Sequence, residues 1–273
     1  MILVVLFHVS QHHEYTNLMQ KTIYYIFGNG FLGVEMFFLL SAYGLCYSYD
    51  NNTLKKFYYN RFTRLIPLYP IALIIGYIKA GTPIKQAVTD FLQQISGIAL
   101  FTDTLDILWY IEALILLYIF FPLLFSFCQW IYKLSNIGLV LAICALFHFI
   151  LIFIPDYWLQ MSIGRVPMII IGVMTFLYDR DNNKKALYLL YGGLTLMAVM
   201  PVFKEMYFFV PASLLLIADS KKCYGEKIIC FIGMHTYEIF IAHHFALWSF
   251  GHVTENYYIT LSVIFFLIII YSN

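Results

Sequence analysis

The sequence predicts an all-α membrane protein, a polytopic bundle of about ten transmembrane helices. Three observations predict this fold class. The composition is too apolar for a soluble protein, the apolar residues form long uninterrupted runs, and the basic residues gather in every second connection between those runs. Together they indicate helices that cross a bilayer in alternating directions.

The composition excludes most other classes of protein. Of the 273 residues, 62% are hydrophobic and 11% are charged, against roughly 45–50% and about 25% in soluble domains. There are too few charges to cover the surface of a soluble domain, and the chain is too hydrophobic to be disordered. A net charge of +1 provides no field that would hold nucleic acid. The 23 Tyr, 26 Phe and 4 Trp suit a chain with many membrane–water interfaces.

The apolar runs define the expected spans. A helix needs about 20 residues to cross the hydrocarbon layer, and strands would need strict alternation of apolar and polar residues. Because the runs are continuously apolar, we expect helices over residues 1–10, 23–49, 65–79, 106–127, 137–154, 162–178, 186–201, 206–218, 228–249 and 257–271. Residues 83–101 are amphipathic, and we expect them to lie flat on the membrane or to dip back into the protein.

The first span is too short to cross a bilayer, since ten helical residues rise only about 15 Å. The true start lies upstream, or the chain is a fragment, or this is a half-helix shielded by its neighbours. We find no repeat, linker or low-complexity tract. We therefore expect residues 1–273 to form a single integral-membrane domain that is incomplete at its N-terminus.

The basic residues predict the orientation. With the chain start inside and ten alternating spans, eleven of the 16 Lys and Arg residues fall inside and five fall outside. The positive-inside rule therefore favours a multi-pass protein of the plasma or inner membrane with a cytoplasmic N-terminus.

Neither the cysteines nor the glycines form a recognisable ligand motif. The five cysteines lack paired-ligand spacing, so we interpret them as small buried hydrophobes and expect no metal site. Gly28, Gly30 and Gly33 resemble a phosphate loop only superficially, because no strand precedes them. In a membrane such glycines permit close helix approach.

Ionisable residues inside apolar spans are candidate functional groups, because a charge in the bilayer is costly. His8 ends the first run, where it is either a headgroup-level histidine or a general base facing a polar cavity. Glu35 and Glu112 lie inside the second and fourth runs and need partners from other spans. Each is either a functional group or half of a pair that fixes helix packing.

Three arginines and a second histidine are further candidates. Arg61 and Arg64 share one helix face, where they either anchor the chain to the inner surface or hold phosphates. Arg165, before the sixth run, is either an interface anchor or a partner for a buried carboxylate. His243 and its neighbour His244 point about 100° apart on a helix, so only one of them can face the interior.

Several motifs occur in an order that resembles the acyltransferase 3 family. Residues 33–43, GVEMFFLLSAY, resemble its G-V-x-x-F-F-x-x-S-G-F signature, with Ala42 in place of the usual glycine. Five other stretches are similar to family patterns, at residues 3–8, 56–67, 108–122, 164–172 and 236–243. The family's first helix usually carries a basic residue eleven positions before the histidine, and here that position would precede Met1.

The resemblance implies an integral-membrane O-acyltransferase of about ten helices. Such an enzyme moves an acyl group, most often acetyl, from cytoplasmic acetyl-CoA to a hydroxyl of an extracytoplasmic or lipid-linked glycan. The catalytic candidates carried over are His8, Glu35 and His243, with His8 as the leading one. The donor-binding candidates are Arg61, Arg64 and Arg165. The implied partners are the lipid bilayer and a glycan, and not nucleic acid.

Two alternatives stay open from the residues alone. The chain could be a membrane transporter or flippase in which the intramembrane His and Glu residues relay protons. The short first span also suits an inactive, truncated homologue.

Overall fold

The computed structural model describes residues 2–11, 21–22, 24, 27–101, 109–155, 157–200, 203, 236–237 and 239–241. This part of the chain is 86% helical and contains no strand, so the predicted all-α class is confirmed. The chain divides into two compact units, residues 1–37 with 218–273 and residues 38–217. The single domain expected from the sequence stays a prediction.

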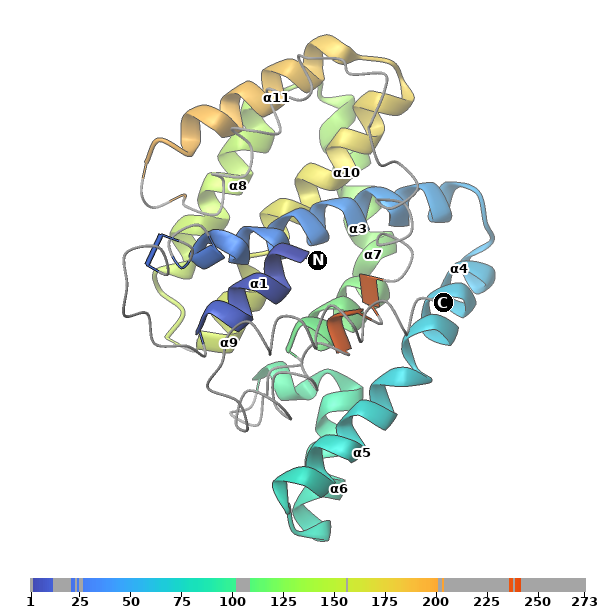
Figure 1. The fold of residues 1–273 in the computed structure, drawn as a ribbon. Helices are drawn as coiled ribbons and strands as arrows, with labels where there is room; N and C mark the ends of the chain where they lie inside the picture. The colour runs from blue at the N-terminus through green and yellow to red at the C-terminus, as the bar shows by residue number, and fades with distance from the viewer. Residues whose placement is uncertain are drawn as a thin grey trace. The chain divides into compact units, whose positions relative to one another are not determined.

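The first unit holds helix α1 (Ile2–Gln11), the 3₁₀ turn η1 (Gly28–Phe31) and the start of α3 (Leu32–Asp50) (Figure 1). Two glycines let these elements approach closely. A Cβ at Gly30 would clash with the carbonyl oxygen of Leu3, and one at Gly33 would lie 2.9 Å from Cγ2 of Val4. These two glycines therefore serve the close helix approach that the sequence predicts, whereas no described atom lies within 4 Å of a Cβ added at Gly28, so the prediction is wrong for that glycine.

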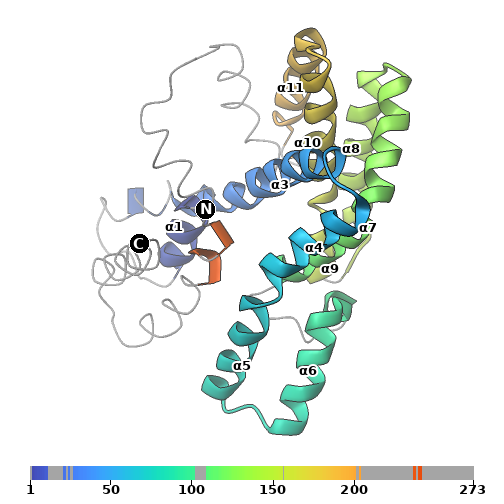
Figure 2. The ribbon, with the colours of Figure 1, turned by 90° about the vertical axis from the view of Figure 1, so that its right-hand side faces the viewer.

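The second unit continues along α3 into α4 (Leu54–Leu65) and α5 (Leu68–Ala80) (Figure 2). The Thr53 side chain caps α4 by accepting a hydrogen bond from the backbone N–H of Lys56 at 3.4 Å. The stretch Leu54–Ile78 is long and apolar enough to cross a membrane. The span predicted over residues 65–79 corresponds to α5, and α4 adds a helix before it. Counting uninterrupted apolar residues excludes lysines and arginines, although their long side chains can reach polar surroundings from inside a span.

A glycine turn connects α5 to α6 (Ile84–Ser96). Gly81 ends α5 in the left-handed conformation, with φ +65°, which costs little only for glycine. Figure 2 shows α5 and α6 running back along each other, and η2 (Ile98–Phe101) follows α6. The amphipathic segment predicted over 83–101 is thus mostly helical, and its position relative to the bilayer stays a prediction.

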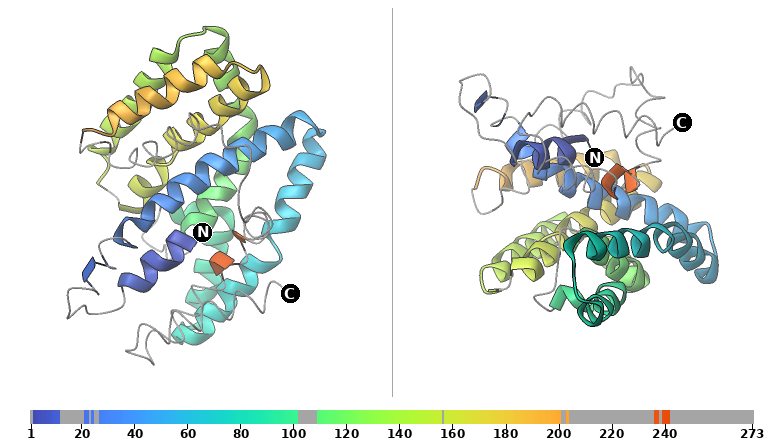
Figure 3. Two further views of the ribbon diagram at one scale, coloured as in Figure 1. Left: turned by 45° about the horizontal axis from the view of Figure 1, so that its top comes forward. Right: turned by 60° about the horizontal axis from the view of Figure 1, so that its bottom comes forward.

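Five further helices complete the described part of the second unit: α7 (Trp109–Lys133), α8 (Ile137–Leu151), α9 (Tyr157–Ile163), α10 (Val166–Arg180) and α11 (Lys184–Met197). Figure 3 shows α8, α10 and α11 lying side by side. The stretch Gln160–Arg180 is 72% buried over its most apolar window, against 22% for Leu54–Ile78. Therefore α10 is a central helix of this unit, and α4 with α5 is peripheral.

Helix α7 continues through a proline. Pro122 lies inside α7, and the helix continues to Lys133, past residue 127, where the sequence predicts that the span ends. A proline removes one backbone hydrogen bond, but the packing of Phe121, Phe125 and Cys128, which are all buried, holds the helix together beyond it. The Ser126 hydroxyl also donates a hydrogen bond of 2.9 Å to the Pro122 carbonyl.

Four helical stretches of the described part are long and apolar enough to cross a membrane: Gly28–Asp50, Leu54–Ile78, Trp109–Lys133 and Gln160–Arg180. Large apolar side chains such as Leu123 (70% exposed) and Leu196 (74% exposed) lie on the surface, where lipid would cover them. The spans predicted after residue 205 fall almost wholly outside the described residues, so the count of about ten stays a prediction.

A polar network joins the ends of three helices of the second unit. Arg180 forms ion pairs of 3.2 Å with both Asp50 and Asp181, and Tyr132 donates a hydrogen bond to Asp181. Tyr43 donates a hydrogen bond of 2.5 Å to Asp179. The Tyr132 hydroxyl, and then the Arg180 guanidinium, lower the pKa of the Asp181 carboxyl below its usual range. The network ties α3, α7 and α10 together where each helix ends.

Candidate active site

The predicted site residues are divided between the two units. His8 and Glu35 belong to the first unit, and Arg61, Arg64 and Arg165 belong to the second. His243 lies outside the described residues. The structure thus places each group within its own unit, and the assignment of these residues to one site stays a prediction.

In the first unit, His8 and Glu35 lie on helices that pack against each other. His8 is partly exposed near the end of α1, and its ring meets that of Phe7 edge-on, with 5.4 Å between ring centroids. Glu35 lies in the first turn of α3 and is 0% exposed. Since Gly33 brings the start of α3 against α1 at Val4, this buried carboxyl and the histidine belong to one packed helix pair.

Helix α4 carries two cations on one face. Arg61 and Arg64 are one turn apart within the stretch that can cross a membrane. The Arg61 guanidinium lies 5.9 Å from the centroid of the Phe57 ring, and its Nε is buried with no hydrogen-bond partner among the described residues. Both arginines interact electrostatically with Tyr118 of α7. Arg61 and Arg64 also repel each other, so a bound anion would relieve an unfavourable interaction.

Aromatic packing holds this face of α4 against α7. Phe57 is 0% exposed and stacks on Phe121, with 5.7 Å between ring centroids. Tyr49 of α3 lies 5.4 Å from Phe57 and 5.9 Å from Phe121. The Tyr58 hydroxyl donates a hydrogen bond of 3.1 Å to the Ile119 carbonyl. The arginines therefore lie on a helix that packing fixes in place.

A buried acid lies further along α7. Glu112 is 0% exposed, and Oε1 accepts a hydrogen bond of 3.3 Å from the hydroxyl of Tyr69, which lies on α5 and is 2% exposed. Oε2 is buried and has no hydrogen-bond partner among the described residues. The sequence identifies Glu112 as an acid in need of a partner, and the structure supplies Tyr69. No spacing in the sequence indicates that pairing.

Arg165 approaches the same turn of α7. It precedes α10, is 5% exposed, and holds its guanidinium 5.7 Å from the centroid of the Trp109 ring. Its Nη2 also donates to the sulfur of Met161, at 4.0 Å. Trp109 and Glu112 are neighbours on the helix surface, because they are three residues apart. The structure thus directs a cation and a buried acid to one end of α7.

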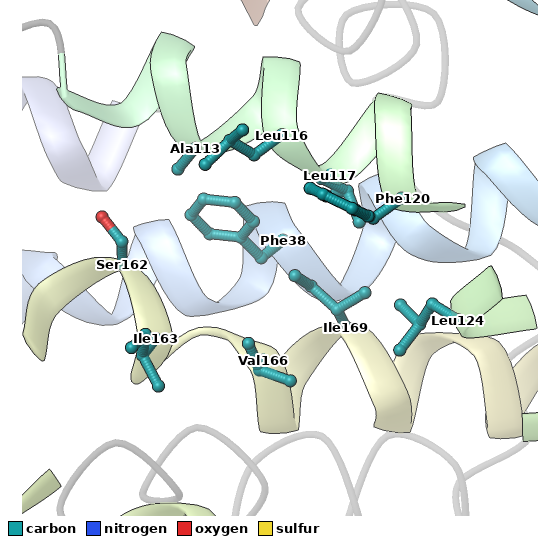
Figure 4. A pocket seen from close by; sticks show the side chains of 10 residues that line it. All are labelled: Phe38, Ala113, Leu116, Leu117, Phe120, Leu124, Ser162, Ile163, Val166 and Ile169. Carbon is teal, nitrogen blue, oxygen red and sulfur yellow. The ribbon is translucent and has the colours of Figure 1, made fainter. Parts of the chain in front are cut away.

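An apolar cavity of about 280 Å³ runs between α3, α7 and the chain from Ser162 into α10. Figure 4 shows its lining. The ten residues that line it are Phe38, Ala113, Leu116, Leu117, Phe120, Leu124, Ser162, Ile163, Val166 and Ile169. The Ser162 Oγ is buried and has no hydrogen-bond partner among the described residues. The sequence does not indicate this cavity, because it forms where three separate helices meet.

Comparison with known protein families assigns the chain. A family model described as an acyltransferase domain, Acyl_transf_3, matches residues 1–272. No curated protein and no solved structure matches the chain. The match extends over the whole chain and agrees with the motifs at residues 33–43 and 56–67. The chain therefore belongs to the acyltransferase 3 family of membrane acyltransferases.

Proposed function

We propose that this membrane acyltransferase moves an acetyl group from cytoplasmic acetyl-CoA to a hydroxyl of an extracytoplasmic or lipid-linked glycan. Membership of the family supports the transfer of an acyl group by a membrane protein. The identities of the donor and of the acceptor belong to the proposal. The observation that carries it is the pair of arginines on α4. Arg61 and Arg64 repel each other within a stretch that can cross a membrane, and the Arg61 Nε is buried without a hydrogen-bond partner in the part of the chain that the structure describes. Such a pair suits a multiply charged anion.

Acetyl-CoA matches this pair in charge. Its phosphate groups are anionic, and the planar guanidinium group presents paired N–H donors to phosphate oxygens. In the orientation that the basic residues predict, the start of α4 lies on the cytoplasmic side, where acyl-CoA is found. The resemblance also suggests Arg165, but in the predicted orientation this residue lies at the outer end of its span, so the proposed donor site consists of Arg61 and Arg64. The Arg165 guanidinium lies 5.7 Å from the centroid of the Trp109 ring.

The proposed reaction uses His8 as the general base. Its imidazole takes the proton from the acceptor hydroxyl as the hydroxyl oxygen attacks the thioester carbonyl carbon. The carbon–sulfur bond then breaks, and the proton passes to the departing thiolate, which yields the acetyl ester and free CoA. A positioned base contributes about 10²–10⁴-fold to such a rate. Glu35 and His243 are the proposed supporting groups.

The test uses the purified chain in liposomes with radiolabelled acetyl-CoA and a glycan acceptor. We expect the wild type to release CoA and to label the glycan, and His8→Ala to lose both activities. The control is His148→Ala, because His148 is a buried histidine of α8 whose Nδ1 contacts the Cys144 carbonyl at 2.9 Å. It should retain activity per folded molecule.

Full activity in His8→Ala would refute the assignment of the base, and movement of substrate without use of acetyl-CoA would favour a transporter.

A further inference from the structure

The apolar cavity of the second unit has the shape of a site for one hydrocarbon chain. Its lining extends along α7 from Ala113 to Leu124. Eleven helical residues rise about 16 Å, close to half of the hydrocarbon thickness of a bilayer, which is about 30 Å. The cavity therefore matches the length of a lipid chain within one leaflet. Its volume of about 280 Å³ is about nine times the roughly 30 Å³ share of a water molecule, which has nearly the volume of a methylene group.

The chemistry of the lining agrees with that occupant. Nine of the ten lining residues present only carbon, and the tenth is Ser162. A space with a single polar lining residue does not hold ordered water well, because a water molecule needs several polar partners. Binding of a hydrocarbon chain there is favourable, because it buries apolar surface.

The two ends of the cavity differ. In Figure 4, Ser162 and Ala113 lie at one end, and Phe120 and Leu124 lie toward the other. The Ser162 Oγ at the first end is buried without a hydrogen-bond partner among the described residues, which is costly unless a ligand supplies one. Arg165 follows Ser162 by three residues and stacks on Trp109, one turn before Ala113. Among the described residues, a hydroxyl and a cation therefore mark this end, together with the buried acid Glu112, which directly precedes Ala113.

We propose that the cavity binds the hydrocarbon chain of an anionic membrane lipid, with the anionic headgroup at Ser162 and Arg165. This lipid site rests on the proposed function, which allows either an extracytoplasmic or a lipid-linked glycan as acceptor. The lipid site favours the lipid-linked acceptor. The polar end of the cavity lies where α7 and α10 begin. In the predicted orientation this is the outer end, where the acceptor hydroxyl would be presented.

The probe for the test is a dodecyl phosphate that carries a diazirine at the end of its chain. The full chain is purified, placed in phosphatidylcholine nanodiscs and irradiated, and the adducts are mapped by mass spectrometry. We expect adducts at the deep end of the cavity, on Phe120 and Leu124. Unlabelled dodecyl phosphate should displace the probe more effectively than dodecanol, because only the phosphate engages the cation at Arg165.

Two neighbouring substitutions separate the cavity from the lipid-facing surface. Leu124→Trp places a large ring in the cavity, and Leu123→Trp places the same ring on an exposed surface of the same helix. We expect Leu124→Trp to lower the adduct yield about tenfold, because the indole takes the space that the chain needs. Leu123→Trp should leave the yield unchanged. If Leu124→Trp does not fold, the wild type alone tests the proposal. The positions of its adducts, and the relative effectiveness of dodecyl phosphate and dodecanol in displacing the probe, then decide.

Three results would overturn the proposal. Adducts confined to lipid-facing residues, with equal yield in both variants, would mean surface lipid only. Displacement by dodecanoyl-CoA and not by dodecyl phosphate would assign the cavity to the chain of an acyl donor. Acetyl transfer to a glycan by a preparation without cavity adducts would leave the proposed function intact and remove the lipid site. Cavity adducts in a preparation that uses no acetyl-CoA would instead keep the lipid site and refute the transfer reaction.

Discussion

The hydroxyl of Tyr69 on α5 donates a hydrogen bond of 3.3 Å to Oε1 of Glu112 on α7, and both side chains are almost fully buried. The bond joins two helices of membrane-crossing stretches that are 43 residues apart in the sequence. A buried acid within such a stretch is costly, and each hydrogen bond it accepts offsets part of that cost. The pair therefore fixes α5 against α7 between the arginine face of α4 and the end that carries Arg165.

We expect Tyr69→Phe to destabilise the protein by about 1–3 kcal/mol, because both Glu112 oxygens then lack a hydrogen bond from the described part of the chain. The same change in a Glu112→Leu background should cost much less, since no buried acid is left to satisfy. Thermal unfolding of the four proteins in detergent measures this difference. Tyr59→Phe is the control, because that ring is 68% exposed on α4. Equal costs of Tyr69→Phe in both backgrounds would show that the hydrogen bond contributes nothing.

The crossing of α3 and α10 gives a second prediction. A Cβ at Gly172 would clash with the Leu39 carbonyl oxygen and lie 2.9 Å from the Ala42 Cβ. Because these atoms belong to the backbone or are attached directly to it, neither helix can yield without moving. We expect Gly172→Ala to cost about 1–3 kcal/mol of stability and to lower the melting temperature.

Gly192→Ala is the matched control for that substitution. Gly192 is also inside a helix, α11, and no atom of the described residues lies within 4 Å of the position of an added Cβ. Alanine there should be neutral or should stabilise the protein by up to about 1 kcal/mol, through helix propensity alone. Similar melting temperatures for the two variants would mean that α3 and α10 do not cross closely at Gly172.

The sequence predicts the parts of this fold that depend on local patterns. Continuous apolar runs are sufficient for the helical class, and the spacing of Arg61 and Arg64 is sufficient to place them on one helix face. The glycine pair Gly30 and Gly33 is also interpreted correctly, because small residues in a membrane permit close approach. Each of these inferences needs only residues that are near one another in the chain.

The features that the sequence misses depend on tertiary contacts. The start of α4 at Leu54 is missed because a polar first turn resembles a loop until the Thr53 cap is seen. The partner of Glu112 and the cavity at Ser162 arise where separate helices meet, so no spacing encodes them. A single sequence reports periodicity along one helix and carries no direct record of which helix lies beside it.

The network at the ends of α3, α7 and α10 predicts a dependence of stability on pH. The pKa of Asp181 is lowered by the Tyr132 hydroxyl and then by Arg180, so folding favours the ionised carboxylate. Its contribution is present above the unfolded value of 3.8 and is lost as the pH falls below that value toward the folded pKa. Melting temperatures between about pH 5 and pH 2 should therefore decrease on acidification.

Two substitutions test this assignment. Asp181→Asn removes the titrating group, and Tyr132→Phe removes the hydrogen bond that contributes most to its lowered pKa. Both should flatten the acid side of the stability curve, and Asp181→Asn should do so more strongly. The control is Tyr188→Phe, which changes an exposed tyrosine of α11. High salt should weaken the effect, since Asp181 is exposed to solvent. An acid decrease of unchanged size in Asp181→Asn would place its origin elsewhere.

The arginine pair on α4 gives the sharpest test of the proposed donor. We expect Arg61→Gln to raise the KM for acetyl-CoA about ten- to a hundredfold with little change in kcat, because a charge-assisted hydrogen bond contributes about 1.5–3 kcal/mol. Arg64→Gln should act in the same direction. Lys55→Gln removes an exposed cation from the first turn of the same helix and should leave KM unchanged.

S-acetyl-pantetheine, which keeps the thioester and lacks phosphates, separates the two explanations of any loss. If the arginines hold phosphates, wild type and Arg61→Gln should use this truncated donor equally well. If the variant is impaired with both donors, Arg61 supports the fold or the reacting centre, and the phosphate assignment is wrong.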